Sequence, residues 1–238
     1  MMSPSANKMS GADIPQRVIL GSRSPRRLEL LSLLVPVQQI AVRPPRSSDE
    51  LGFDGLTTWL EIAKRLQSIA RDKNDNVCRQ LAKDNVSPVL VLTADTTIVA
   101  TDAAGCLHVL GQPPDDDSWK QVVKGWFRDL YADRSHVAAT AVCLTEWPTG
   151  RRVERIVQSH VWMRADVLPL VDWYLSTGEP QGKAGGYALQ GLGSLFVSRV
   201  EGSLTNVVGL PLEVLAELLP EFGWSLASLG SSSETGVS

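Results

Sequence analysis

Two adjacent arginines, Arg26 and Arg27, stand where a helix should begin. A short apolar run at residues 18–20 leads through a Gly-Ser turn into a predicted helix, with Ser24 as N-cap and Pro25 in the first position. Cations in this first turn oppose the positive end of the helix dipole. Backbone N–H groups, hydroxyls and guanidiniums therefore meet at one point, which favours a bound phosphate. The alternative is a pair of solvated arginines on a surface helix.

An aspartate, Asp95, directly follows an apolar run at residues 88–94. Such a run is typical of a central strand that is buried on both faces. The carboxyl ends of such strands form the edge of α/β sheets where ligands bind. A carboxylate there could hold a metal ion or act as a general base. The alternative is an aspartate that only begins a turn.

Lys73 lies inside the apolar stripe of a long predicted helix at residues 57–83. Ile69 precedes it by one helical turn and Val77 follows it by one turn. A buried lysine is costly unless it has a charged partner. Two interpretations stay open: its ammonium extends outward to solvent, or it points into a cleft that holds an anion.

A glycine-rich segment at residues 182–191 carries Lys183 and Gln190. Glycines at this density let the backbone approach a ligand closely. The lysine supplies a positive charge, and the glutamine amide can both donate and accept hydrogen bonds. The alternative is a solvated loop. Residues 178–183 are one residue short of a P-loop, and Ala184 stands where that motif requires Ser or Thr.

Strand-like and helix-like segments alternate along the chain, which predicts a single mixed α/β domain. The segments at residues 97–100 and 107–110 read as one hairpin, and those at residues 136–145 and 152–162 as another. The remaining expected strands are residues 18–20, 37–42, 88–94 and 194–200. Five helices are expected: one that begins at residue 25, three at residues 57–83, 115–130 and 166–176, and a last one from about residue 211 to before residue 223.

Composition narrows the class of protein. The chain has 238 residues and a formal net charge of −3, which argues against a partner of duplex nucleic acid. No apolar run is long enough for a membrane helix, and the N-terminus has no secretory h-region. Three widely spaced cysteines predict reduced thiols and a cytoplasmic location. We expect flexible ends at residues 1–16 and 224–238 around a domain at residues 17–223.

Several motifs occur in a fixed order, and together they resemble the Maf family of nucleoside triphosphate pyrophosphatases over roughly residues 17–219. The resemblance implies an elongated mixed α/β fold with a deep cleft, related to the inosine triphosphate pyrophosphatases, and a homodimer. It also implies that Mg²⁺ or Mn²⁺ assists hydrolysis of the α–β phosphoanhydride. The motifs are Ser22-x-Ser-Pro-Arg-Arg-x-Glu-Leu-Leu31, Ala94-Asp-Thr96, Gly182-Lys-Ala-Gly-Gly-Tyr-Ala-Leu-Gln-Gly191, Glu201-Gly-Ser203 and Asn206-Val-Val-Gly-Leu-Pro-Leu212.

The resemblance assigns roles to particular residues of this chain. Asp95 is the proton acceptor, and Glu50 and Asp95 hold the metal. Lys73 matches the lysine of the family's Leu-Ala-x-x-Lys helix and counts as catalytic together with these two carboxylates. The substrate contacts are Ser22, Arg26, Arg27, Thr96, Lys183 and Gln190.

One departure from the family pattern concerns charge. Many members have Gly-Lys-Pro after the hairpin, whereas this chain has Gln112 at the lysine position. The loss of a phosphate-binding lysine predicts either weaker activity or compensation by Arg46 or Lys183.

Three positions that differ between family subgroups are Arg26, Thr96 and Gln190 in this chain. This set resembles the subgroup that acts on dTTP and UTP. The subgroup that acts on 7-methyl-GTP has an aromatic residue, a glutamine and an acidic residue there. The Gln190 amide can pair with the imide edge of uracil or thymine, and it has no negative charge to attract a methylated guanine. We therefore predict dTTP and UTP, with modified pyrimidine nucleotides as further candidates.

Two functions from other classes are alternatives. A regulatory protein could bind nucleoside triphosphates without hydrolysing them, and Gln112 is the one feature that favours it. An RNA-binding module is disfavoured by the acidic net charge and by the lack of an aromatic and basic motif.

Overall fold

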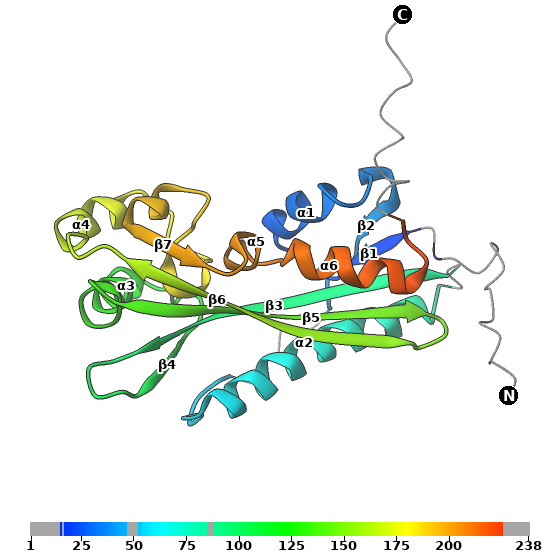
Figure 1. Cartoon of the computed structure of the whole chain (residues 1–238), viewed down its shortest axis with the longest axis horizontal. Coiled ribbons are helices and arrows are strands. Elements are labelled where there is room, and N and C mark those ends of the chain that lie inside the picture. The colour runs from blue at the N-terminus through cyan, green and yellow to red at the C-terminus, as the bar shows by residue number, and fades with distance from the viewer. Residues whose placement is uncertain (1–14, 16, 47–51, 85–87, 226–238) are drawn as a thin grey trace, which may run out of the picture.

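A long twisted sheet runs along the length of the molecule (Figure 1). The computed structural model describes residues 15, 17–46, 52–84 and 88–225. Within these residues the sheet has seven strands in the order β2-β1-β3-β5-β6-β7, with β4 beside β3. The strands are β1 (Val18–Leu20), β2 (Ile40–Val42), β3 (Val89–Thr101), β4 (Leu107–Leu110), β5 (Ser135–Trp147), β6 (Arg152–Met163) and β7 (Val197–Glu201).

Helices cover both faces of the sheet. In Figure 1, the long helix α2 crosses one face, whereas α1, α5 and α6 lie on the other. The α-helices are α1 (Pro25–Ser32), α2 (Trp59–Leu81), α3 (Trp119–Trp126), α4 (Leu168–Ser176), α5 (Leu204–Val208) and α6 (Leu212–Leu218). Short 3₁₀ and π turns are η1 (Val37–Gln39), η2 (Phe127–Tyr131), η3 (Ala184–Gly186), η4 (Leu192–Phe196) and η5 (Leu219–Phe222).

The strand β3 changes partners along one of its edges. Residues 90–92 pair in parallel with β1, and residues 98–101 pair antiparallel with β4. On the other edge, β5 pairs with β3 from Val89 to Ala100. On the edge that β1 and β4 share, residues 93–97 pair with no strand in the described part of the chain. The sheet edge therefore has an opening, and Asp95 lies in its middle.

Two of the apolar clusters pack beneath helices at opposite ends of the sheet. Figure 1 shows α3 and α4 at one end and α1 and α6 at the other. One core lies between α3, α4 and β6, where Phe127 meets Tyr131 and Phe196 edge to face at ring distances of 5.3 and 4.9 Å. Such aromatic pairs add about 0.5–1.5 kcal/mol each beyond their buried area. The other core packs α1 and α6 onto β1 and β3. The opening beside β3 falls between these two cores, so each of its walls belongs to a packed body.

Helix α2 forms for local reasons and docks through polar contacts. Thr58 and Glu61 form a capping box at its start, which satisfies two backbone donors of the first turn. Its apolar stripe faces the sheet. Asn74 is fully buried in this stripe and donates from Nδ2 to the carbonyls of Val91 at 2.9 Å and Cys143 at 3.2 Å. These bonds fix the position of α2 along the sheet.

The expected strands and helices are present, but several differ from the expectation in extent or, over a few residues, in type. Residues 37–42 divide into η1 and the three-residue strand β2. The runs at 88–94 and 97–100 join into the single strand β3, with Asp95 inside the strand and not after it. The expected helix at 115–130 begins only at Trp119, because the Asp116 carboxylate accepts hydrogen bonds from the backbone and hydroxyl of Ser118 and forms a turn there. Residues 194–196 belong to η4, and β7 begins at Val197.

Sequence analysis missed the helix α5, which has five residues. Its signals are present: the Ser203 side chain accepts a hydrogen bond from the backbone of Asn206, and Gly209 follows the helix with a φ of 127°. At the C-terminus, Trp224 is buried in the core with α1 and α6. Pro15 is likewise buried.

The cysteine thiols are not joined in disulfides: Cys78, Cys106 and Cys143 are all free. Burial raises the pKa of the Cys143 thiol to about 12, which keeps it protonated and unreactive. Among the residues that the structure describes, no helix combines the length and apolar character that crossing a lipid bilayer requires.

Candidate active site

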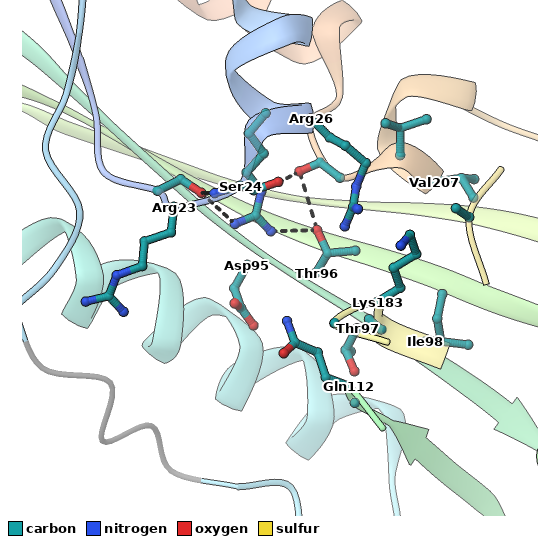
Figure 2. Close-up of a pocket in the computed structure, with 18 of the residues that line it drawn as sticks. Arg23, Ser24, Arg26, Asp95, Thr96, Thr97, Ile98, Gln112, Lys183 and Val207 are labelled. Atoms are coloured by element: carbon teal, nitrogen blue, oxygen red, sulfur yellow. Dashed lines mark hydrogen bonds between the residues drawn. The ribbon is translucent and has the colours of Figure 1, made fainter. Parts of the chain in front are cut away.

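A cleft of about 680 Å³ occupies the opening beside β3 (Figure 2). Its walls are the end of β1, the first turn of α1, the middle of β3, the end of β4, the glycine-rich segment before η4 and the end of α5. Glu50 lies outside the described residues, and Arg46 is not among the residues that line the cleft. The structure does bring together Ser22, Arg26, Arg27, Lys73, Asp95, Thr96, Gln112, Lys183 and Gln190.

Asp95 and Lys73 form an ion pair at the wall of the cleft. The Lys73 Nζ lies 2.5 Å from Asp95 Oδ1, and the two side chains are only 17% and 15% exposed. This pair resolves the two interpretations of Lys73, because its ammonium turns toward the cleft carboxylate and not outward. The hydroxyl of Thr93, two residues before Asp95, donates to the carbonyl of Ala70 at 2.7 Å and holds α2 against β3 at this level.

The two arginines of the first turn of α1 have different surroundings. Arg27 donates from Nε to the carbonyl of Gly209 at 2.9 Å and from its terminal nitrogens to the hydroxyls of Thr96 at 3.1 Å and Ser22 at 3.4 Å. It thereby ties the start of α1 to β3 and to the end of α5. Arg26 makes no hydrogen bond or ion pair with the described residues, and Figure 2 shows its guanidinium extending across the cleft toward Lys183. Arg26 is therefore the arginine available to a ligand.

The hydroxyls of Ser24 and Thr96 do not make the contacts that the sequence predicts for them, which are a helix cap and a substrate contact. The Ser24 side chain makes no capping hydrogen bond; the Ser22 hydroxyl instead accepts from the Ser24 backbone at 3.1 Å. The Thr96 hydroxyl bonds to Thr140 at 2.9 Å and accepts from Arg27, so its polar atom is engaged by the protein. Next to it, Thr97 lines the cleft and is 2% exposed, and its hydroxyl has no hydrogen-bond partner among the described residues.

Lys183 and the glycines around it form the opposite wall. Its Nζ donates to the carbonyl of Glu179 at 2.6 Å. Burial lowers the pKa of the Lys183 ammonium, and the nearby charge of Arg26 lowers it further. Gly185 has a φ of 72°, and a Cβ there would lie 2.6 Å from both Ile98 and the Tyr131 hydroxyl. Only glycine fits at this position, so Gly185 lets the segment pack closely against β3.

The cleft carries a strong positive charge. Among the described residues, its lining has one carboxylate, Asp95, against the cationic side chains of Arg23, Arg26, Arg27, Lys73 and Lys183. This local excess of four positive charges contrasts with the formal net charge of −3 for the whole chain. Because a concave surface of one sign concentrates ions of the opposite sign, the arrangement fits a ligand with several negative charges.

Few side chains of the described cleft can serve as ligands of a metal ion. No cluster of three or more His, Cys, Asp or Glu side chains occurs among the described residues. Asp95 is the one carboxylate of the cleft lining in that part of the chain. Mg²⁺ is commonly bound through one or two carboxylates together with phosphate oxygens of a substrate, not by an all-protein cage. The residues present therefore fit a metal that binds together with a polyphosphate.

Sequence reasoning missed the residues that support the glycine-rich segment. Tyr187 lines the cleft, and its hydroxyl lies 2.8 Å from Nε2 of the buried His136. Glu179 bonds to backbone groups on the far side of Gln190. Neither residue interrupts an apolar stripe or neighbours another charged group of the site in the sequence. The spacing of residue types along the chain therefore does not indicate that they belong to the site.

Fold and site define an α/β protein with a cationic cleft that is suited to a polyphosphate ligand. The family model described as "Maf-like protein" matches residues 17–222, and the chain belongs to the Maf family. A protein from Syntrophus aciditrophicus (strain SB), named dTTP/UTP pyrophosphatase, is 33% identical over 94% of this chain and 98% of its own. One of the same name from Anaeromyxobacter dehalogenans (strain 2CP-1 / ATCC BAA-258) is 37% identical over 88% and 96%.

A solved structure from Mycobacterium abscessus ATCC 19977 / DSM 44196 also matches this chain. This nucleoside-triphosphatase / dITP/XTP pyrophosphatase is 17% identical and covers 87% of this chain and 96% of its own. The TM-score is 0.40, which is too low to support a statement about fold or function.

Proposed function

We propose that this protein is a nucleoside triphosphate pyrophosphatase that hydrolyses dTTP and UTP to the monophosphate and pyrophosphate. The observation that carries the proposal is the Asp95–Lys73 pair at the wall of a cleft with a large excess of positive charge. The relatives named dTTP/UTP pyrophosphatase align over almost their whole length, which supports the same activity here. Gln112 is the one sequence feature in favour of a purely regulatory protein, and neither the relatives nor a contact of the described residues adds support for that function.

The cationic side chains neutralise the substrate before the reaction. A triphosphate carries about four negative charges, and charge-assisted hydrogen bonds from guanidinium and ammonium groups are the strong ones. Arg26 and Lys183 extend into the cleft from opposite walls and contact the phosphate chain directly. Arg27 supports them by fixing the first turn of α1, whose N–H groups face the same anion.

Asp95 acts on the water nucleophile. Lys73 holds Oδ1 of the carboxylate, which orients the side chain and leaves Oδ2 for the water. The water attacks the α-phosphorus in line with the bond to the β-phosphate, and Asp95 takes one of its protons. A new P–O bond forms to the water oxygen, the α–β bridge breaks, and the electron pair of that bond leaves with pyrophosphate.

A divalent cation, Mg²⁺ or Mn²⁺, completes the proposed site. Asp95 would hold it, together with Glu50, which lies outside the described residues. When bound, such an ion neutralises phosphate charge and makes a bound water more acidic.

Gln190 reads the base in this proposal. Its amide donates to a carbonyl and accepts from the N3–H of uracil or thymine. A site that hydrogen-bonds one base edge rejects analogues strongly, because its polar groups are otherwise left without partners.

The test is pyrophosphate release in the presence of Mn²⁺, measured as kcat/KM for dTTP, UTP and 7-methyl-GTP side by side. We expect the two pyrimidine nucleotides to be preferred. If the protein binds the nucleotides but releases no pyrophosphate, the proposed hydrolysis is wrong and the regulatory function takes its place. A preference for 7-methyl-GTP would show that Arg26, Thr96 and Gln190 do not set specificity in this chain.

We also propose that the protein works as a homodimer in the cytoplasm and without a nucleic-acid partner. The resemblance to the family supports the dimer, and the net charge of −3 argues against nucleic-acid binding. Light scattering after gel filtration measures the mass, and a monomer mass would contradict the dimer.

A further inference from the structure

The turn at residues 178–182, which fails as a P-loop, has a defined conformation. Gly178 and Gly182 flank it with φ values of 73° and 67°, a region that side-chain-bearing residues rarely adopt. The backbone of Gln181 donates to the Gly178 carbonyl at 3.2 Å and closes the turn. The turn places Glu179, which is half-buried, beside the glycine-rich segment.

The Glu179 carboxylate holds the backbone that follows Gln190. Its Oε2 accepts from the N–H of Leu192 at 2.8 Å, and its Oε1 accepts from the N–H of Gly193 at 2.9 Å. The Tyr174 hydroxyl donates to Oε1 at 3.1 Å. A carboxylate that accepts hydrogen bonds from two successive backbone N–H groups fixes both their position and their direction.

Close packing leaves this turn little freedom. A Cβ on Gly191 would lie 2.4 Å from a Glu179 carboxylate oxygen, and one on Gly193 would lie 2.8 Å from the Ala188 nitrogen. The Gly191 N–H also donates to the Ala188 carbonyl at 3.2 Å. Gln190 lies inside this closed turn, so the Glu179 carboxylate sets where its side chain enters the cleft.

The same residue also holds the start of the glycine-rich segment. The Glu179 carbonyl accepts from Lys183 Nζ at 2.6 Å. One residue thus connects the cation that faces the phosphates with the amide that faces the base, through its carbonyl and its carboxylate respectively.

We propose that Glu179 is a positioning residue for base recognition: its carboxylate holds the turn that presents Gln190 and thereby sets the preference for pyrimidines with an imide edge. This inference rests on the proposed function. Since a hydrogen-bonding site must be placed to well within 1 Å to discriminate, release of the two N–H groups impairs recognition of the base before it impairs chemistry at the phosphate.

The test compares three triphosphates in the wild type and in Glu179→Gln: dTTP, dCTP and 2-deoxyribose 5-triphosphate, which has no base. The glutamine has the same size, but its amide turns an NH₂ group toward one of the two N–H groups. We expect the ratio of kcat/KM for dTTP over dCTP to fall at least about tenfold, mainly through KM for dTTP. Hydrolysis of the substrate without a base should change less than about twofold, because the Glu179 carbonyl still holds Lys183.

Two further variants separate positioning from stability. Tyr174→Phe removes the third contact to the carboxylate and leaves both backbone contacts, so we expect a lower melting temperature with unchanged selectivity. Leu192→Pro removes one of the two N–H groups and leaves Glu179 intact. Proline is tolerated at the first position of η4, and the preceding Gly191 has the extended backbone that proline requires. It should reduce selectivity in the same direction, and it stands in for Glu179→Gln if that variant does not fold.

Equal losses for all three substrates, or unchanged selectivity in Glu179→Gln and Leu192→Pro, would overturn the proposal. If the wild type releases no pyrophosphate from any of them, the proposed function fails separately. The dissociation constants of α,β-imido analogues of dTTP and dCTP, measured by calorimetry, then decide the role of Glu179 in the same three proteins.

Discussion

The two ends of the cleft are built in different ways. The phosphate end, formed by Ser22, Arg26, Arg27, Lys73 and Asp95, draws its contacts from distant parts of the chain. Arg27 alone bonds to partners 69 and 182 residues away. At the base end, residues 178–193, Glu179 holds the turn that presents Gln190 through bonds that span only 13 and 14 residues. Long-range bonds are made instead by Gly185 and Tyr187, which precede this turn.

This difference separates the determinants of chemistry from those of selectivity. The phosphate end depends on the packing of β1, β3, α2 and α5 against one another, so a change there affects the whole fold and the reaction. The base end is a local turn on a packed body, so its contacts can change without moving Asp95. The predictions below test whether catalysis and base recognition are separable in this way.

The largest effect is expected from Asp95→Asn. This substitution keeps the shape of the side chain and removes the general base. We expect kcat to fall about 100-fold or more for every substrate, with the ratio of dTTP to dCTP unchanged. Steady-state kinetics and thermal unfolding provide the measurements. Turnover close to that of the wild type would show that another group accepts the proton.

Gln190→Glu should act on the opposite end alone. A carboxylate cannot donate to a base carbonyl, so we expect kcat/KM for dTTP and UTP to fall at least about tenfold. Hydrolysis of 2-deoxyribose 5-triphosphate serves as the control and should stay near the wild-type rate. A matching loss with that control substrate would mean that the two ends are coupled.

Lys73→Met tests the phosphate end as a structural unit. An apolar side chain in the helix stripe removes a desolvation cost, but the mostly buried Asp95 carboxylate then lacks its ion-pair partner. We expect the free energy of unfolding to fall by about 1–2 kcal/mol and KM for dTTP to rise. The double variant with Asp95→Asn should recover stability, and a double-mutant cycle in urea measures this coupling. Additive losses would exclude a stabilising pair.

Gln112→Lys changes a residue between the two ends of the cleft and should have a smaller effect on activity. Gln112 lines the cleft at the end of β4, and Figure 2 shows its side chain near Asp95. A cation there adds a charge-assisted bond to the triphosphate, so we expect KM to fall a few-fold at low salt. The gain should shrink as ionic strength rises. Gln112→Met is the uncharged control, and an equal gain in it would rule out charge as the cause.

The last prediction concerns stability and not activity: the base end should make the stability of the fold depend on pH. His136 is buried, and burial lowers the pKa of its imidazole from 6.5 to about 3. Below pH 6.5 the unfolded chain binds a proton that the folded state excludes, so stability decreases as pH falls from about 6.5 toward 3 and is fully present above. In His136→Gln, the slope of the free energy of unfolding against pH should be smaller by the contribution of one proton. His108 and His160, both exposed, are present in both proteins. An unchanged slope would contradict a neutral His136.

The local features of the phosphate end could be predicted from the sequence. The start of α1 at Pro25 follows from residues that are neighbours in the chain, and the burial of Lys73 follows from the helical period. The different surroundings of Arg26 and Arg27 could not be predicted, because Gly209 approaches only through tertiary packing. Residues 194–196 were expected in a strand, but backbone bonds to Glu179 begin a 3₁₀ turn before them. No periodic pattern encodes such a contact.

The charge of the cleft has a kinetic consequence. A concave site whose described lining has an excess of four positive charges, on an acidic chain, attracts a triphosphate before contact, while the remaining surface repels it. Encounter should therefore be faster than a neutral surface allows, and it should slow steeply as salt shortens the range of the field to about 8 Å at physiological ionic strength. The same field also retains the pyrophosphate product, so departure from the cleft becomes a step that ionic strength accelerates.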